Sequence, residues 1–275
     1  MKIFKKILRN KLSVIGILLF LLIFLSCIFA PFLTPYNPSS IDMMNMSKAP
    51  SSSHIFGTDN IGRDVFSRIL YGGRVSMLVG ALGALFGTLI GTFLGAIAGY
   101  FGGKIDSALV RCSEVFLTIP DLILILVLST IFGQGVGNII LVFTITGWMT
   151  TFRIVRSGFM QTKQETFVSA CQSFGISDSR IIFNNILPNT LSPVCVAFSV
   201  NVAGFVLAEA GLSFIGVGIP SDVPTWGNII NAAKSIDVIK NYWWLWIIPG
   251  LAISGFVLSI NFMGDALRDI MDPKE

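Results

Sequence analysis

Residues 122–152 decide the fold of this chain. The stretch contains no Asp, Glu, Lys or Arg, and its middle reads Gly133-Gln134-Gly135-Val136-Gly137-Asn138. As one helix it would be about 46 Å long at 1.5 Å per residue, whereas a bilayer core is about 30 Å thick. Because glycine-rich runs interrupt helices, the stretch predicts two membrane spans, roughly 115–132 and 137–152.

Four other long stretches also lack charged side chains: 12–41, 75–103, 181–208 and 241–264. Each can cross a bilayer, which brings the predicted spans to six. The composition agrees, since 53% of the residues are hydrophobic, only 12% are charged and the mean hydropathy is +0.78. We therefore predict an all-α integral membrane protein, and a soluble enzyme, a nucleic-acid binder and a disordered chain are excluded.

The basic residues predict how the spans are oriented, because Lys and Arg accumulate in short cytoplasmic loops. With six spans and a cytoplasmic N-terminus, thirteen of the 19 Lys and Arg residues lie inside and six outside. If residues 122–152 formed one helix instead, nine of these basic residues would lie inside and ten outside. We therefore predict that both termini are cytoplasmic. The first apolar run is longer than the 7 to 15 residues of a signal-peptide core, so we expect an uncleaved first helix.

The chain is expected to divide at about residue 74. Residues 1–74 would form the first span and an extracytoplasmic loop, and residues 75–275 a five-helix transmembrane domain. Within the loop, four apolar side chains at helical spacing predict a short interfacial helix: Val65, Phe66, Ile69 and Leu70. The loop also holds Asp59 and Asp64, but the pattern lacks the bidentate Glu that closes a calcium loop.

The second span has a face made of glycine. Five glycines recur at every fourth position: Gly83, Gly87, Gly91, Gly95 and Gly99. Such small-residue faces let helix backbones approach closely in a membrane. We expect this face to form a tight helix–helix contact.

Residues 153–190 form the largest predicted cytoplasmic segment. A first helix, 165–174, carries four apolar side chains on one face: Phe167, Ala170, Cys171 and Phe174. Gly175 is the expected helix stop, and Ser177 the expected cap of a second short helix that ends at Pro188. The pattern fits two structures: a hairpin lying on the membrane surface, or a helix docked into a groove of a soluble partner.

This segment contains a specific motif. It reads Ala170-Cys171-x-x-Phe174-Gly175, followed by Asp178, Arg180 and Ile186-Leu187-Pro188-Asn189. The motif resembles the cytoplasmic coupling loop of ATP-binding-cassette (ABC) importer permeases. The resemblance implies that the loop contacts an ATPase subunit through these residues: Glu165, Phe167, Ala170, Cys171, Phe174, Gly175, Asp178, Arg180, Leu187 and Pro188. The family triplet Glu-Ala-Ala is here Ser169-Ala170-Cys171, and Glu165, one turn earlier, is the alternative acidic anchor.

Other stretches between residues 57 and 273 resemble the oligopeptide, dipeptide and nickel importer subfamily, in the order of its second permease subunit. They read Gly57-Thr58-Asp59 with Gly62-Arg63-Asp64, Tyr100-Phe101-Gly102-Gly103-Lys104-Ile105-Asp106, Ala208-Glu209-Ala210-Gly211-Leu212-Ser213-Phe214-Ile215-Gly216, Pro224-Thr225-Trp226-Gly227, and Gly264-Asp265-Ala266-Leu267-Arg268-Asp269 with Asp272-Pro273. The resemblance implies the MetI-like fold of type I importer permeases in the cell membrane. It also implies a sister permease, two cytoplasmic ATPase subunits and an extracytoplasmic substrate-binding protein as partners.

The chain itself lacks the residues for ATP chemistry. No Gly-x-x-x-x-Gly-Lys-Ser/Thr phosphate loop occurs, so ATP and Mg²⁺ are expected in the partner subunits and no cofactor in this one. The single histidine, His54, has no nucleophile or metal-ligand pattern beside it, and the four cysteines have no CxxC spacing. We therefore expect a non-catalytic subunit. Di- or oligopeptides are the favoured cargo, nickel or a metal chelate the alternative, and a secondary transporter or channel the remote alternative.

Two acidic residues are predicted at membrane depth, where charges usually have a function. Asp121 follows Pro120 and is expected to begin a helix. Glu209 lies about 27 Å along its span, near the outer end. It is a candidate either for pairing with an arginine of the outer loop or of the sister permease, or for lining the pathway.

Overall fold

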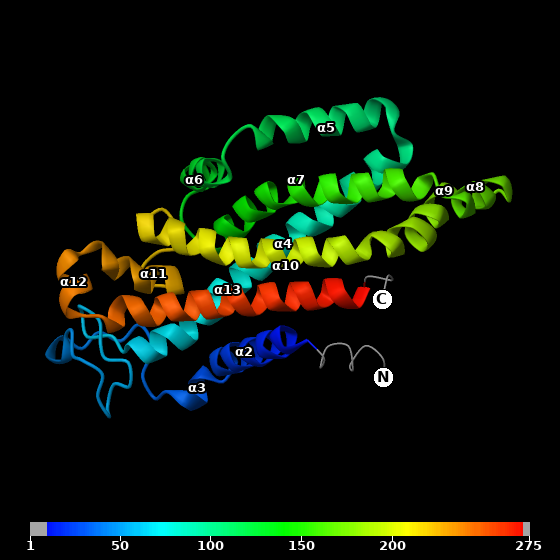
Figure 1. Ribbon diagram of the computed structural model, residues 1–275. Coiled ribbons are helices and arrows are strands. Elements are labelled where there is room, and N and C mark those ends of the chain that lie inside the picture. The colour runs from blue at the N-terminus through cyan, green and yellow to red at the C-terminus, as the bar shows by residue number, and fades with distance from the viewer. Residues whose placement is uncertain (1–9, 272–275) are drawn as a thin grey trace.

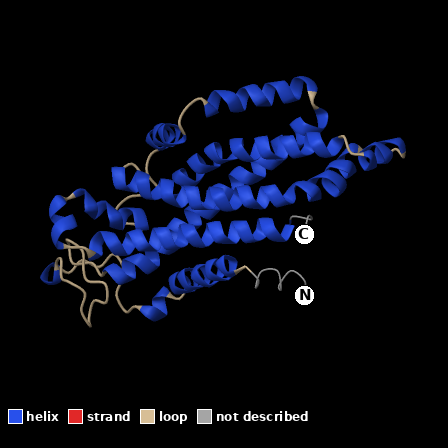
Figure 2. Cartoon of the chain, viewed as in Figure 1, coloured by secondary structure: helices blue, strands red, loops and turns tan. Residues whose placement is uncertain are grey.

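The computed structural model describes residues 10–271, and every regular element in that part of the chain is a helix (Figures 1 and 2). The expectations for Lys2, Lys5, Lys6, Arg9, Asp272, Pro273 and Lys274 lie outside the described residues. The helices are α2 (Lys11–Ile28), α3 (Ala30–Leu33), η1 (Met43–Asn45), α4 (Val65–Phe101), α5 (Gly103–Leu117), α6 (Asp121–Phe132), α7 (Val136–Lys163), α8 (Thr166–Ser173), α9 (Asp178–Arg180), η2 (Ile181–Ile186), α10 (Leu187–Ile215), α11 (Trp226–Ile230), η3 (Asn231–Lys234), α12 (Ile236–Asn241) and α13 (Trp244–Met271).

The long helices lie roughly side by side. α8 and α9 project at one end of the bundle, which we call the hairpin end, and α3, α12 and the loop of residues 34–64 lie at the other, the loop end (Figure 1). α2 starts and α13 finishes toward the hairpin end (Figure 1). Five helices of the described chain are long and apolar enough to cross a membrane, which confirms the all-α membrane fold.

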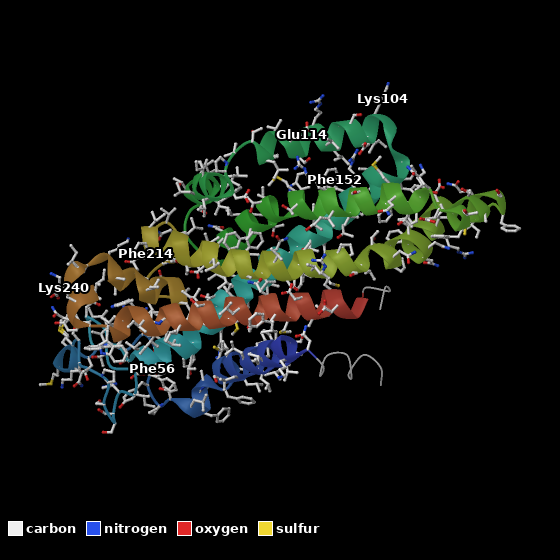
Figure 3. All side chains as sticks on the ribbon, viewed as in Figure 1. Phe56, Lys104, Glu114, Phe152, Phe214 and Lys240 are labelled. Carbon is white, nitrogen blue, oxygen red and sulfur yellow. The ribbon has the colours of Figure 1, made fainter. Side chains whose placement is uncertain are left out.

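The sixth candidate span differs from the prediction. The break at Gly133 is confirmed, but the helix before it is not one span over 115–132. It is the pair α5 and α6, bent by 89° across residues 118–120. Pro120 explains the bend, because proline disfavours helical conformation in the residue before it. Lys104, at the start of α5, points away from the bundle (Figure 3).

The predicted glycine face of α4 packs directly on α7. A Cβ atom added at Gly91 would lie 2.5 Å from the carbonyl oxygen of Trp148, and one at Gly87 would lie 3.0 Å from Gly147. Only glycine permits backbones to come this close. α10 completes the core, since the rings of Phe143 on α7 and Phe205 on α10 stack with centroids 4.5 Å apart. The expected tight helix contact is therefore confirmed.

The predicted interfacial helix is not a separate element. It is the first two turns of α4, so that the expected domain division at residue 74 falls inside this helix. Arg68 was predicted to lie in the outer loop, before the charge-free stretch 75–103, yet it is only 2% exposed. Its guanidinium donates to the carbonyl of Pro38 at 3.2 Å and lies 3.9 Å from Asp59. The loop therefore supplies the hydrogen-bond and ionic partners that allow this basic side chain of α4 to be buried.

Candidate functional site

The helix α8 ends at a turn that depends on glycine. Gly175 has a φ of +71°, in the left-handed region that glycine adopts at little cost. Its N–H donates to the carbonyl of Gln172 at 3.0 Å, and the N–H of Ile176 donates to the carbonyl of Cys171 at 3.1 Å. These two bonds form a Schellman motif, and they confirm the predicted helix stop.

The predicted apolar stripe of α8 is divided between two faces. Val168 is fully buried in a core beneath the hairpin, and Cys171 packs against the same core. Phe167 and Phe174 face outward, with 41% and 85% of their surfaces exposed, and Ala170 is exposed between them. Cys171 therefore departs from the prediction of one shared face, because it follows Val168 by three residues and lies on the same side of the helix.

Polar contacts hold the hairpin on the ends of α4 and α7. Tyr100 Oη donates to Asp178 Oδ1 at 2.5 Å, and Lys163 Nζ donates to the carbonyl of Tyr100 at 2.5 Å. Beside them, Arg156 forms a two-point ion pair with Asp106. Because Tyr100 is only 3% exposed and belongs to the core under α8, the hairpin is attached firmly to the membrane-spanning helices.

The second short helix of the hairpin is continuous with the next span. α9, η2 and α10 make one apolar helix over residues 178–215, so the expectation that Pro188 ends a helix is wrong. In η2, a π-helical turn, the N–H of Leu187 donates to the carbonyl of Ile182, five residues back. A regular helix would place that proline ring against a carbonyl four residues earlier. The wider π turn relieves this clash.

The segment between the long helices is shorter than the predicted coupling segment 153–190, because helices extend into it at both ends. α7 continues to Lys163, so only residues 164–177 lie between the long helices. Glu165 occupies the N-cap position of α8 and is exposed, as is Arg180. Among the described residues neither forms an ion pair. Both charged side chains therefore lie on the exposed surface of the hairpin.

Glu209 is fully buried near the loop end of α10. Its Oε2 accepts a hydrogen bond from Ser76 Oγ at 3.1 Å, and its Oε1 accepts one from Ser213 Oγ at 2.8 Å. Ser76 Oγ also accepts the N–H of Trp226 at 3.2 Å. The carboxylate thus joins α4, α10 and α11. Its partners in the described chain are hydroxyl groups, which corrects the expectation of an outer-loop arginine.

A groove of about 530 Å³ lies between α7, α10 and the end of α13. Its polar lining consists of Thr150, Asn189, Ser192, Asn201 and Arg268. Asn201 lies about 21 Å along α10 from Leu187, well inside a membrane. Lipid tails offer no hydrogen bonds to amides and hydroxyls at this depth, so this surface is suited to face water or another protein.

A smaller cavity of about 70 Å³ continues this groove toward α6. It shares Thr150 and Asn201 with the groove and adds Thr146 and Asp121. Asp121 is the first residue of α6, which confirms its predicted place at a helix start. The groove was not predicted, because its lining inside the apolar stretches carries no charge; the available signal in the sequence was Asn201, a neutral amide within an apolar stretch.

The acidic residues of the loop end stabilise local structure. Asp64 Oδ2 accepts the N–H and hydroxyl of Ser67, both at 2.7 Å, while Oδ1 lies 2.9 Å from His54 Nδ1. Asp59 accepts the N–H of Arg63 at 2.9 Å and its guanidinium at 2.6 Å. Asp64 stands between His54 and Ser67, so these three side chains do not form a nucleophile–base pair.

Residues 91–275 match the family described as binding-protein-dependent transport system inner membrane component. Residues 2–50 match the N-terminal transmembrane domain of oligopeptide transport permease C. The two regions lie on either side of the expected division at residue 74.

Relatives match over nearly the whole chain. The dipeptide transport system permease protein DppC of Bacillus subtilis is 38% identical, covering 98% of this chain and 84% of the relative. The oligopeptide transport system permease protein OppC of the same organism is 36% identical, covering 96% of this chain and 86% of the relative. A putative peptide permease protein of Brucella suis is 37% identical, covering 98% of this chain and 89% of the relative.

One solved structure shows the same fold at low sequence identity. In an inward-facing form of the MetNI methionine ABC transporter, a chain superimposes with a TM-score of 0.58 and 16% identity. The match covers 74% of this chain and 96% of the other. The arrangement of helices in the bundle is therefore the MetI-like permease fold.

Proposed function

The chain belongs to the family of binding-protein-dependent transport system inner membrane components, the permeases of ABC importers, and we propose that it forms a translocation pathway together with a sister permease. The polar groove on α7 and α10 supports this role. Its amides and hydroxyls need partners that lipid does not provide, and a second permease supplies a polar surface with water between the two. Glu209 takes the helix-joining role and lies outside the pathway.

The exposed side of α8 supports the proposal that this chain is coupled to an ATPase. Phe174 is 85% exposed although the opposite face of the helix is packed and anchored. An exposed aromatic pair on a rigid helix fits a hydrophobic groove on a partner. We assign the partner as a cytoplasmic ATPase subunit, which binds ATP and Mg²⁺ and moves the permease through this contact. Glu165 and Arg180 lie at the rim of the contact.

We propose di- or oligopeptides as the cargo, delivered by an extracytoplasmic substrate-binding protein. The names of the relatives, dipeptide and oligopeptide permeases, support peptides over nickel or a metal chelate. Co-purification distinguishes this proposal from a secondary transporter, since only an ABC importer requires two ATPases and a second permease.

The proposed orientation places the hairpin end in the cytoplasm. Ser52 and Gln164 are exposed at opposite ends of the molecule and serve as probes. In a variant without the native cysteines, a membrane-impermeant thiol reagent should label Ser52→Cys in intact cells and should miss Gln164→Cys. The reverse pattern would contradict the orientation.

Peptide uptake tests the function. In cells whose own peptide permease is deleted, the wild-type chain, expressed with its neighbouring subunits, should restore uptake of a radiolabelled dipeptide. Phe174→Ala should lower that uptake at least about tenfold while the complex still assembles. Phe93→Ala, which removes a 60% exposed phenylalanine from α4, is the matched control and should transport normally. Equal uptake by the two variants would contradict the coupling role.

A further inference from the structure

A second groove, of about 520 Å³, lies on the opposite side of α10 and is almost entirely apolar. α2, α4, α10 and α13 form its walls. The side chains that line it include Phe24, Leu78, Ala81, Val202, Phe256 and Met263. On α10, Val202 faces this groove whereas Asn201 faces the polar one. The two grooves are therefore separate surfaces with different chemistry.

One charged residue, Arg74, lines this groove. Its Nε donates to the carbonyl of Cys27 and its Nη2 to the carbonyl of Ile28, both at 2.6 Å, and Tyr71 lies against the guanidinium at 4.8 Å. These contacts hold one edge of the guanidinium on the end of α2. Its Nη1 has no hydrogen-bond partner within the described chain, so the two N–H donors of Nη1 remain available beside an apolar groove.

The position of Arg74 matches the boundary of the membrane core. α2 has 18 residues and is about 27 Å long, close to the thickness of the hydrocarbon layer, so its last residue, Ile28, lies at the loop-side boundary. From there the walls run inward over eight residues on α2, to Phe20, and over eight on α4, to Leu82, or about 12 Å each; the α13 wall is longer, running over eleven residues from Phe256 to Leu267, or about 16 Å. One leaflet of the core is about 15 Å deep.

A cationic mouth at the membrane boundary, above an apolar groove long enough for an acyl chain, matches the polarity of a phospholipid. We propose that this groove binds one phospholipid of the loop-side leaflet, with an acyl chain between α2 and α10 and the phosphate on Arg74. The lipid would fill the space between α2 and the rest of the bundle. It would thereby attach the peripheral first helix to α10, the helix that also lines the polar groove.

Photolabelling of the full-length chain, with the subunits that co-purify with it, tests the proposal. The complex is placed in phosphatidylcholine nanodiscs that contain phosphatidylglycerol with a diazirine on one acyl chain. A diacylglycerol with the same chains and diazirine but no phosphate is the second probe. We expect label on the α10 and α13 peptides that contain Val202 and Met263, at least about fivefold more from the phosphate-bearing probe.

Two variants separate the chain site from the phosphate site. Leu78→Trp fills the mouth of the groove from a position that is already 47% exposed, and it should remove most of the label. Arg74→Gln should abolish the preference for the phosphate-bearing probe. Leu89→Trp, at a 56% exposed position on α4 outside the groove, is the control for folding and should label like the wild type.

Two results would overturn the proposal. Equal labelling by both probes, unchanged in Leu78→Trp, would show ordinary bilayer contact without a site. Absence of label from the groove peptides, together with a disulfide between Leu78→Cys and another subunit, would show that a protein helix covers the groove.

Discussion

Gly175 allows the proposed coupling hairpin to be weakened without removing a contact. A Cβ atom at this position would meet nothing within 4 Å, and the φ of +71° is the sole obstacle to other residues. Holding an L-residue in the left-handed region costs about 1–2 kcal/mol. Gly175→Ala should therefore shift the equilibrium between the formed and unformed end of α8 by a factor of roughly 5 to 30.

The cost should depend on the side chain in a defined order. Asparagine tolerates left-handed conformation better than alanine, and a β-branched residue tolerates it worst. Coupling should therefore decline from Gly175→Asn through Gly175→Ala to Gly175→Val. The assay is ATPase stimulation by peptide-loaded binding protein in proteoliposomes, run beside peptide uptake, with the amount of assembled permease pair as the control.

Assembly should stay constant across this series, because the hairpin core and the membrane helices are unchanged. The proposed role of the Gly175 turn is refuted if Gly175→Val shows wild-type ATPase stimulation and wild-type peptide uptake. It is also refuted if the three variants lose activity equally, since that result would not follow the backbone strain.

Three further predictions concern contacts inside the bundle. Gly91→Ala should lower the thermal stability of the purified complex by about 1–3 kcal/mol, because its Cβ meets an α7 carbonyl at 2.5 Å; Gly204→Ala, with nothing within 4 Å, should not, and equal melting temperatures would contradict the packing argument. Glu209→Leu should destabilise the complex by several kcal/mol, because the buried hydroxyls of Ser76 and Ser213 lose their acceptor, and Glu209→Gln by less; a Leu variant that assembles and transports normally would contradict the joining role. Tyr100→Phe should remove the bond to Asp178 and cost about 1 kcal/mol of hairpin stability, seen as faster hydrogen exchange in α8, and unchanged exchange would count against it.

Local sequence signals predicted much of this structure. The glycine run at residues 133–138 marked a helix break, the four-residue glycine spacing marked the α4–α7 contact, and Gly175 marked a helix end. Each of these depends on backbone conformation or close approach within a short stretch. Such properties can be inferred from residue type alone.

Most of the features that were missed depend on partners far away in the chain. Arg68 stays inside α4 because Pro38, thirty residues earlier, accepts its hydrogen bond. Glu209 is bonded to Ser76, 133 residues away. Pro188 continues a helix because the preceding turn widens, a cooperative adjustment that no single residue type specifies. The polar groove likewise exists only where α7, α10 and α13 meet.

The proposed function depends most on a contact between α8 and an ATPase subunit. A photoreactive benzoylphenylalanine placed at Phe174, in the assembled complex in membranes, tests it directly. We expect a covalent product with the ATPase subunit, and only lipid products from the same group placed at Phe93. Lipid products alone from position 174 would show that the hairpin lies on the membrane surface, which would contradict the coupling role of α8.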